Sequence, residues 1–303
     1  MPRRREPPRG PWLDALLACP RCRGKLSSDG GGPHGLYRCR ACGPYPRLAG
    51  VPVLVPEPEG WCSGFRDAVL ASLAEVGAAS ADAVAVVDAF ASAAPHAEAR
   101  RFGDDWTAEE AGGLADASRA TPSRALAALL ASARTASPAS WILRHAPRGG
   151  VALEVGCGAG VTGAALARRA GRLVVADVSL RAVLKARSRG LQAAGEVAGV
   201  VVDAEALPFA SGAVDLLVAE NLVDLLDAPA DFLAEARRVL APKGRALVTT
   251  PEPSLGTDDD GTVRALAEAA GFTVAARADG LTWVRAHSPR FVEVYVVQAL
   301  AFE

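Results

Sequence analysis

Residues 151–160 read Val-Ala-Leu-Glu-Val-Gly-Cys-Gly-Ala-Gly, an apolar run that passes directly into a glycine-rich loop. From residue 147 to residue 303, short apolar runs alternate with helical patterns, which predicts a doubly wound α/β sheet. In such a sheet the ligand sits outside the carboxyl end of the first strand. Glycines let the backbone approach that ligand closely, and the free N–H groups at the next helix start face it.

The pattern around this loop predicts the remaining elements of the sheet. We expect further strands near 172–177, 199–202, 214–219 and 244–250, and helices near 161–170, 179–191, 229–240 and 260–270. The chain ends differently, with two strand-like runs, 281–285 and 291–298, that no helix separates and that should pair antiparallel. Four glycines just past helical stretches are expected to accept positive φ: Gly171, Gly190, Gly244 and Gly271.

The loop itself fits two classes of ligand. Gly158, Gly160 and Gly163 satisfy the dinucleotide fingerprint. Asp177 follows at the expected distance of about twenty residues. Glu154, just ahead of the loop, instead suits the cationic ammonium of a methionine group better than a pyrophosphate. The loop pattern alone therefore does not decide between a nicotinamide dinucleotide and S-adenosylmethionine.

Two features outside the loop favour S-adenosylmethionine. A second acid, Asp203, follows the third expected strand, where it can contact adenine. The antiparallel pair expected at the chain's end matches the seventh-strand insertion of class I methyltransferases, whereas nicotinamide-binding folds end differently.

Taken together, these segments resemble the class I methyltransferase superfamily, in the branch with quinone-biosynthesis-type enzymes. The matching segments are Glu154–Gly160, Asp177, Asp203-Ala204, Val214–Asn221 and Phe232–Gly244. The resemblance implies a doubly wound, seven-stranded methyltransferase sheet with a terminal antiparallel hairpin and S-adenosylmethionine as cofactor. It implies these cofactor-binding residues: Glu154, Gly156, Cys157, Gly158, Gly160, Asp177, Val178, Asp203, Ala204 and Glu220.

The sequence departs from the family at two positions. Leu225 stands where family members often carry a His shortly after the fourth strand. The Asn-Pro-Pro-Tyr signature of amide and base N-methyltransferases is absent after Ala219, which argues against methylation of an exocyclic base nitrogen.

Two Cys-x-x-Cys knuckles, Cys19-Pro-Arg-Cys22 and Cys39-Arg-Ala-Cys42, lie sixteen residues apart. This spacing predicts a four-cysteine zinc site, because each knuckle presents two thiolates from one tight turn. A segment this short cannot build its own core, so the metal would supply much of its folding energy. Two disulfides or a redox pair are the alternatives; the expected cytosolic setting opposes the first, and the lack of a surrounding βαβ unit opposes the second.

The cysteine-rich segment resembles the small zinc-ribbon family that activates tRNA and protein methyltransferases as a separate subunit. The similarity runs from Leu17 to Glu57 and includes Gly50-Val-Pro-Val-Leu-Val-Pro-Glu57. The same ribbon also occurs fused to bacterial methyltransferases. One departure is that only Pro44 separates Gly43 from Tyr45, where the family usually has two residues.

Composition and charge suggest four parts: a basic tail (1–10), a zinc ribbon (11–60), a helical cap segment (61–146) and the methyltransferase core (147–303). The net charge of −1 divides into +5 for residues 1–60 and −6 for the rest. No stretch approaches the ~20 apolar residues of a membrane span, and no apolar region follows the charged start. We therefore expect a bacterial, cytoplasmic protein without a membrane partner.

The sequence predicts S-adenosylmethionine-dependent methyl transfer to a small molecule or peptide. An RNA methyltransferase that grips nucleic acid with its ribbon is one alternative, favoured by the basic N-terminal region and disfavoured by the acidic remainder. A non-catalytic methyltransferase activator is the other, and the intact cofactor motif argues against it. No residue is assigned as a catalytic base; Trp106 is a candidate for contact with substrate or cofactor.

Overall fold

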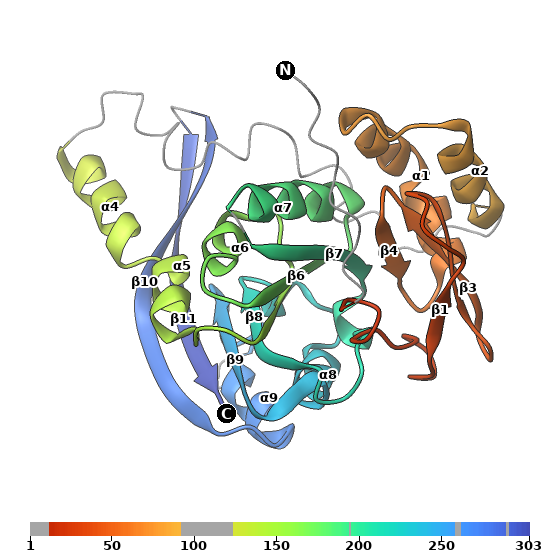
Figure 1. Ribbon diagram of the computed structural model, residues 1–303. Coiled ribbons are helices and arrows are strands. Elements are labelled where there is room, and N and C mark those ends of the chain that lie inside the picture. Colours follow the sequence, from red (N-terminus) through yellow and green to blue (C-terminus); the bar gives the residue numbers. More distant parts are fainter. Residues whose placement is uncertain (1–11, 92–123, 194, 258–261, 289–290) are drawn as a thin grey trace.

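The computed structural model describes residues 12–91, 124–193, 195–257, 262–288 and 291–303 (Figure 1). Trp106, the tail 1–10 and the middle of the helical cap segment lie outside the described residues. The described chain is built around one mixed sheet with helices packed on both of its faces.

Seven consecutive strands form the core sheet in the order β7-β6-β5-β8-β9-β11-β10. The first five are parallel, and β11 runs antiparallel to both β9 and β10. The strands are β5 (Val151–Val155), β6 (Arg172–Asp177), β7 (Glu196–Val202), β8 (Val214–Glu220), β9 (Leu240–Thr250), β10 (Val274–Ser288) and β11 (Phe291–Phe302). The predicted strands 151–155 and 172–177 are confirmed without change, whereas 199–202, 244–250 and the two terminal runs are longer than predicted.

The two faces of the sheet carry separate apolar clusters, because successive strand side chains point to opposite sides. Ala152 packs on one face with Leu166 and Val183, and Leu153 packs on the other with Phe232 and Val263. The core helices that cover these faces are α6 (Val161–Leu166), α7 (Leu180–Gln192), α8 (Pro229–Val239) and α9 (Thr262–Ala269). This arrangement confirms the doubly wound α/β architecture.

Four further strands extend this sheet, so the prediction of a seven-stranded sheet is wrong for the sheet as a whole. They are β1 (Leu26–Ser28), β2 (Gly35–Cys39), β3 (Gly43–Leu48) and β4 (Val51–Leu54). β4 pairs parallel with β7, with Leu54 opposite Val202, which gives an eleven-stranded sheet. Without β4, β7 would be an edge strand with unpaired backbone N–H and C=O groups.

The described part of the cap segment is helical, as predicted. Its helices are α1 (Pro58–Glu75), α2 (Ala81–Phe90), α4 (Arg124–Thr135) and α5 (Pro138–His145). α1 and α2 lie beside the ribbon, and α4 lies at the opposite end of the molecule against the long β10–β11 hairpin (Figure 1). Leu130 of α4 packs there against Val284 of β10. Among the described residues, none of the helices combines the length and apolarity needed to cross a membrane.

The prediction of positive φ at four glycines is correct only for Gly271, which has φ +87°. Gly190 lies inside α7, where a Cβ would stand 2.9 Å from the Val197 side chain. Gly244 lies inside β9, and at Gly171 a Cβ would meet the Gly150 carbonyl oxygen at 3.0 Å. A larger side chain at Gly171 or Gly190 would collide with its neighbours. Close packing therefore explains glycine at these two positions, and backbone conformation does not.

Candidate functional site

The glycine loop joins β5 to α6 through three residues in the left-handed region of φ. Gly156, Gly158 and Gly160 have φ values of +70°, +46° and +74°, which L side chains rarely adopt. At Gly160, which caps α6, a Cβ would stand 2.4 Å from the Ala186 Cα of α7. The loop therefore needs glycine both for its backbone path and for the close approach of α7.

Asp177, at the end of β6, holds this loop in place. Its carboxylate accepts hydrogen bonds from the backbone N–H groups of Gly158 and Ser179, each at 3.0 Å. Cys157, which is buried, donates its backbone N–H to the Ala176 carbonyl at 3.0 Å. Burial raises the pKa of Asp177, and the hydrogen bonds from the backbone oppose that rise.

Glu154 is the most constrained acid of the site. Only 3% of its surface is exposed, and its Oε2 atom has no hydrogen-bond partner. A Cβ on Gly163 would stand 2.3 Å from that oxygen, so a larger residue there would force the Glu154 carboxyl group to shift. Burial raises the pKa of Glu154 well above its ordinary value, the neighbouring charges of Glu220 and Asp177 raise it further, and the backbone N–H of Gly163 opposes the rise.

Glu220 ends β8 on the other side of β5. It accepts a hydrogen bond from the Thr162 hydroxyl at 2.5 Å, so β8 is tied to the first turn of α6. Burial raises the pKa of Glu220, and the bond from Thr162 opposes that rise. Three carboxyl groups with raised pKa values therefore gather at the carboxyl ends of β5, β6 and β8.

Asp203 and Ala204 follow β7 at the same edge of the sheet. Asp203 accepts a hydrogen bond from the Glu205 N–H at 2.9 Å and caps a short 3-10 helix, η3 (Ala204–Ala206). The structure thus brings all the predicted cofactor residues to the carboxyl ends of four adjacent parallel strands.

Sequence reasoning missed two residues of this region, Trp61 and Thr250. The Trp61 indole of α1 donates a hydrogen bond to the Val178 carbonyl at 2.9 Å, which places α1 against the end of β6. Thr250, the last residue of β9, donates a hydrogen bond at 2.8 Å to Asp224, which lies four residues after the end of β8. Burial raises the pKa of Asp224. No sequence pattern marks Trp61, because its partner is a backbone carbonyl more than a hundred residues away.

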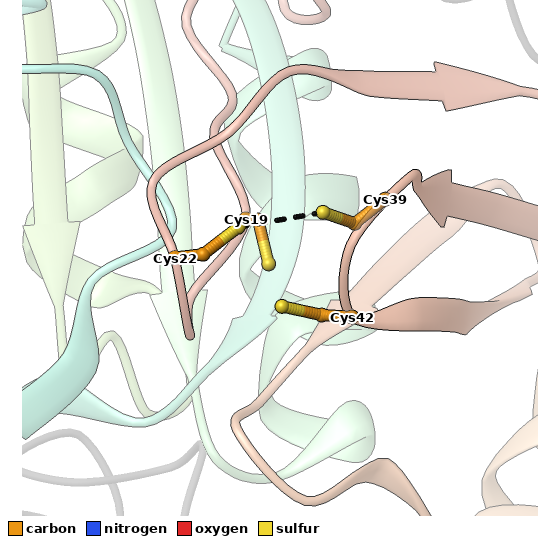
Figure 2. A group of neighbouring side chains, drawn as sticks. All are labelled: Cys19, Cys22, Cys39 and Cys42. Atoms are coloured by element: carbon orange, nitrogen blue, oxygen red, sulfur yellow. Dashed lines mark hydrogen bonds between the residues drawn. The ribbon is translucent and has the colours of Figure 1, made fainter.

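The four knuckle cysteines lie together at one end of the ribbon (Figure 2). Their sulfur atoms are all within 4.8 Å of one another, and Cys22 and Cys39 are 3.5 Å apart. A tetrahedron with Zn–S bonds of about 2.3 Å separates its sulfurs by about 3.8 Å, so the four positions fit a zinc ion. The Tyr45 hydroxyl lies 3.2 Å from the Cys19 sulfur and supports that ligand from outside the cluster.

Comparisons with known proteins find similarity to part of this chain. Residues 153–248 match a family model described as a methyltransferase domain. The fold is an α/β methyltransferase fold. The biotin biosynthesis bifunctional protein BioHC of Cellvibrio japonicus is 35% identical over 101 residues, which cover 33% of this chain and 20% of that protein. The chain therefore aligns with only about a fifth of this curated relative.

Two solved structures resemble part of this chain at low identity. A TehB-like SAM-dependent methyltransferase from Corynebacterium glutamicum is 22% identical, with a TM-score of 0.43 over 55% of this chain and 85% of that chain. A chain from the Haloferax volcanii complex that contains the Trm112 methyltransferase activator is 18% identical, with a TM-score of 0.45 over 56% of this chain and 89% of that chain.

We expect Gly160→Ala to destabilise the protein more than Gly149→Ala, although both glycines have similar positive φ. Gly149, at φ +78°, has no atom within 4 Å of a built Cβ, so alanine there costs roughly 1–2 kcal/mol for its backbone conformation alone. At Gly160 the clash with Ala186 adds about 1–3 kcal/mol. Urea denaturation measures both; equal costs would show that α7 moves freely away from the loop.

We expect the purified protein to hold one zinc ion per chain, and Cys22→Ser to lower that content strongly. Cys62→Ser is the matched control, because Cys62 is buried in α1 outside the cluster and should leave the metal content unchanged. Metal analysis of the three proteins decides the question. A wild-type protein without zinc, or equal loss in both variants, would contradict the assignment.

Proposed function

We propose that the chain binds S-adenosylmethionine and transfers its methyl group to a small-molecule or peptide acceptor. The observation that carries this proposal is the set of three carboxyl groups around the glycine loop, of which Glu154 and Asp177 are buried and Glu220 is half-buried. Ionised carboxylates that are buried together need a compensating cation. A pyrophosphate would add negative charge to this edge, whereas the ammonium and sulfonium of S-adenosylmethionine supply positive charge.

Each residue of the site has a role that fits its position. We propose that Glu154, through its unpartnered Oε2, accepts the methionine ammonium, which would satisfy that oxygen. Asp177 would bind the ribose hydroxyls, and Asp203 with Ala204 would contact the adenine, as the resemblance implies. Gly156, Cys157, Gly158 and Gly160 would let the backbone lie against the cofactor, while Val178 and Glu220 line its two sides.

Methyl transfer from a sulfonium is an in-line displacement, and the sulfonium is already an activated leaving group. The chain would therefore accelerate the reaction mainly by alignment of the acceptor. The hydrogen bonds that fix the loop through Asp177, and α6 through Thr162, hold the cofactor residues rigidly for that purpose. A base would be required only if the acceptor must lose a proton.

We expect Glu154→Gln to weaken cofactor binding and to stabilise the cofactor-free protein. Loss of a charged hydrogen bond should raise the dissociation constant roughly 10- to 100-fold. Because the pKa of Glu154 is raised in the folded chain, its ionisation costs stability as the pH rises above the ordinary carboxyl range. An amide removes that cost, so the free energy of unfolding at neutral pH should rise by roughly 1–3 kcal/mol.

Calorimetry with S-adenosylmethionine and denaturation without it measure the two effects. Glu59→Gln, an exposed position on α1, should change neither. In the wild type, binding should release protons and weaken as the pH falls, since the cation competes with the proton on Glu154. A wild-type protein that binds no S-adenosylmethionine would overturn the proposal and favour the non-catalytic activator.

A second candidate, RNA methylation, is favoured by a basic patch on the ribbon that consists of Lys25, Arg38 and Arg40. All three side chains are exposed beside the cysteine cluster, and among the residues that the structure describes they have no hydrogen bond or ion pair. A row of cations without partners is suited to phosphate contacts. The acidic remainder of the chain limits such binding to the ribbon.

If this patch binds RNA, affinity should fall steeply with salt, by about one logarithmic unit per tenfold salt for each phosphate contact. Substitution of Lys25, Arg38 and Arg40 by Ala together should flatten that slope by about 2–3. Fluorescence anisotropy with a labelled RNA measures it, and the Arg148→Ala variant, outside the ribbon, is the control. Affinity that is absent at low salt, or unchanged in the triple variant, would leave the small-molecule or peptide acceptor as the function.

A further inference from the structure

The first cysteine knuckle lies directly against the segment 207–210, which follows Asp203 and η3. The Ala18 N–H donates to the Pro208 carbonyl, and the Ala210 N–H donates to the Leu16 carbonyl, each at 2.9 Å. Leu17 and Phe209 thereby form an isolated antiparallel bridge. The ribbon therefore contacts the core through this bridge, through the pairing of β4 with β7, and through Arg187 of α7, which donates to the Ala49 carbonyl at 3.1 Å.

A chain of charged side chains reinforces the bridge. Arg23, which directly follows Cys22, places its guanidinium 2.9 Å from Glu235 of α8 and donates to the Leu207 carbonyl at 3.4 Å. Glu235 in turn accepts two bonds from Arg238, at 2.8 and 2.7 Å. Arg238 donates to the carbonyls of Leu207 and Phe209, at 2.8 and 2.6 Å. We call Arg23, Glu235 and Arg238 the clamp.

The two arginines of the clamp donate hydrogen bonds to the backbone just after the segment that carries Asp203. Three residues separate Asp203 from Leu207, and together they form η3. η3 is also held through its own Glu205, whose carboxylate accepts a hydrogen bond from the Ala228 N–H at 2.6 Å. The backbone position of Asp203 and Ala204 is therefore fixed by β7 before them and by the clamp after them.

The conformation of Arg23 depends on the knuckle. Its φ of +62° is unusual for a side-chain-bearing residue, and its N–H closes the turn by a bond to the Cys19 carbonyl at 2.9 Å. A metal held by Cys19 and Cys22 would fix this turn. Without it the turn would be held by the backbone bonds between Cys19 and Arg23 and between Cys19 and Gly24. If Arg23 moved, Glu235, whose side chain is 12% exposed, would lose one of its two cationic partners.

We infer that the clamp residues are positioning residues, which couple metal occupancy of the ribbon to the affinity of the Asp203–Ala204 segment for the cofactor. The inference rests on the proposed function, since the segment is assigned to adenine by that proposal. Such coupling is reciprocal, so bound cofactor must also strengthen retention of the metal.

The test compares Arg23→Ala with Arg21→Ala, an exposed arginine of the same knuckle. We expect Arg23→Ala to raise the dissociation constant of S-adenosylhomocysteine about five- to twentyfold at full zinc occupancy, and Arg21→Ala to leave it unchanged. Hydrogen exchange of residues 203–210 should speed up in Arg23→Ala only. Arg23→Lys, which keeps the charge but loses the forked geometry, should give an intermediate value.

Zinc release to a chelator provides a second readout that needs no activity. S-adenosylhomocysteine should slow the release about five- to twentyfold in the wild type, and much less in Arg23→Ala. Unchanged affinity and exchange in Arg23→Ala, with normal zinc content, would overturn the clamp while the proposed function stands. Absence of S-adenosylhomocysteine binding in the wild type would instead overturn the proposed function on which the clamp rests.

Discussion

The burial of acidic side chains at one edge of the sheet is the constraint on which the candidate site depends. Glu154, Asp177 and Glu220 come from three adjacent strands, and burial raises the pKa of each, while the charges of Glu220 and Asp177 raise that of Glu154 further. Backbone N–H groups satisfy Asp177 and a hydroxyl satisfies Glu220, but Glu154 keeps one oxygen without a partner. A site with an unpartnered carboxylate oxygen favours a positively charged ligand and disfavours a phosphate.

The contacts at β7 and at the segment that follows it show how the ribbon and the core pack together. The ribbon adds four strands to the sheet, and its first knuckle is bound to the segment that follows β7. Tyr37 and Tyr45 of the ribbon and Phe209 of the core belong to one buried apolar cluster. The ribbon thus shares an apolar cluster with the core and does not form a separate small module.

Much of the fold could be predicted from the sequence, because it depends on local patterns. Periodicity and spacing along the chain are enough to predict the strand at 151–155, its glycine loop and the cysteine pairs. These patterns can be recognised without knowing which segments pack against them. The sites of contact between distant segments could not be predicted in this way. Nothing in the pattern of Val51–Leu54 indicates that it pairs with β7, and nothing marks Trp61 as the donor to Val178. The positive-φ expectation failed at Gly171 and Gly190 for the same reason, since their neighbours come from elsewhere in the chain.

The parallel pairing of β4 with β7 also affects how this protein can be divided. A fragment that began at residue 147 would contain all seven core strands, yet it would present β7 as a bare, fully apolar edge along Val200–Val202. Such an edge is a template for intermolecular pairing. If the two parts were encoded by separate genes, β7 would be covered only while the two products stayed associated.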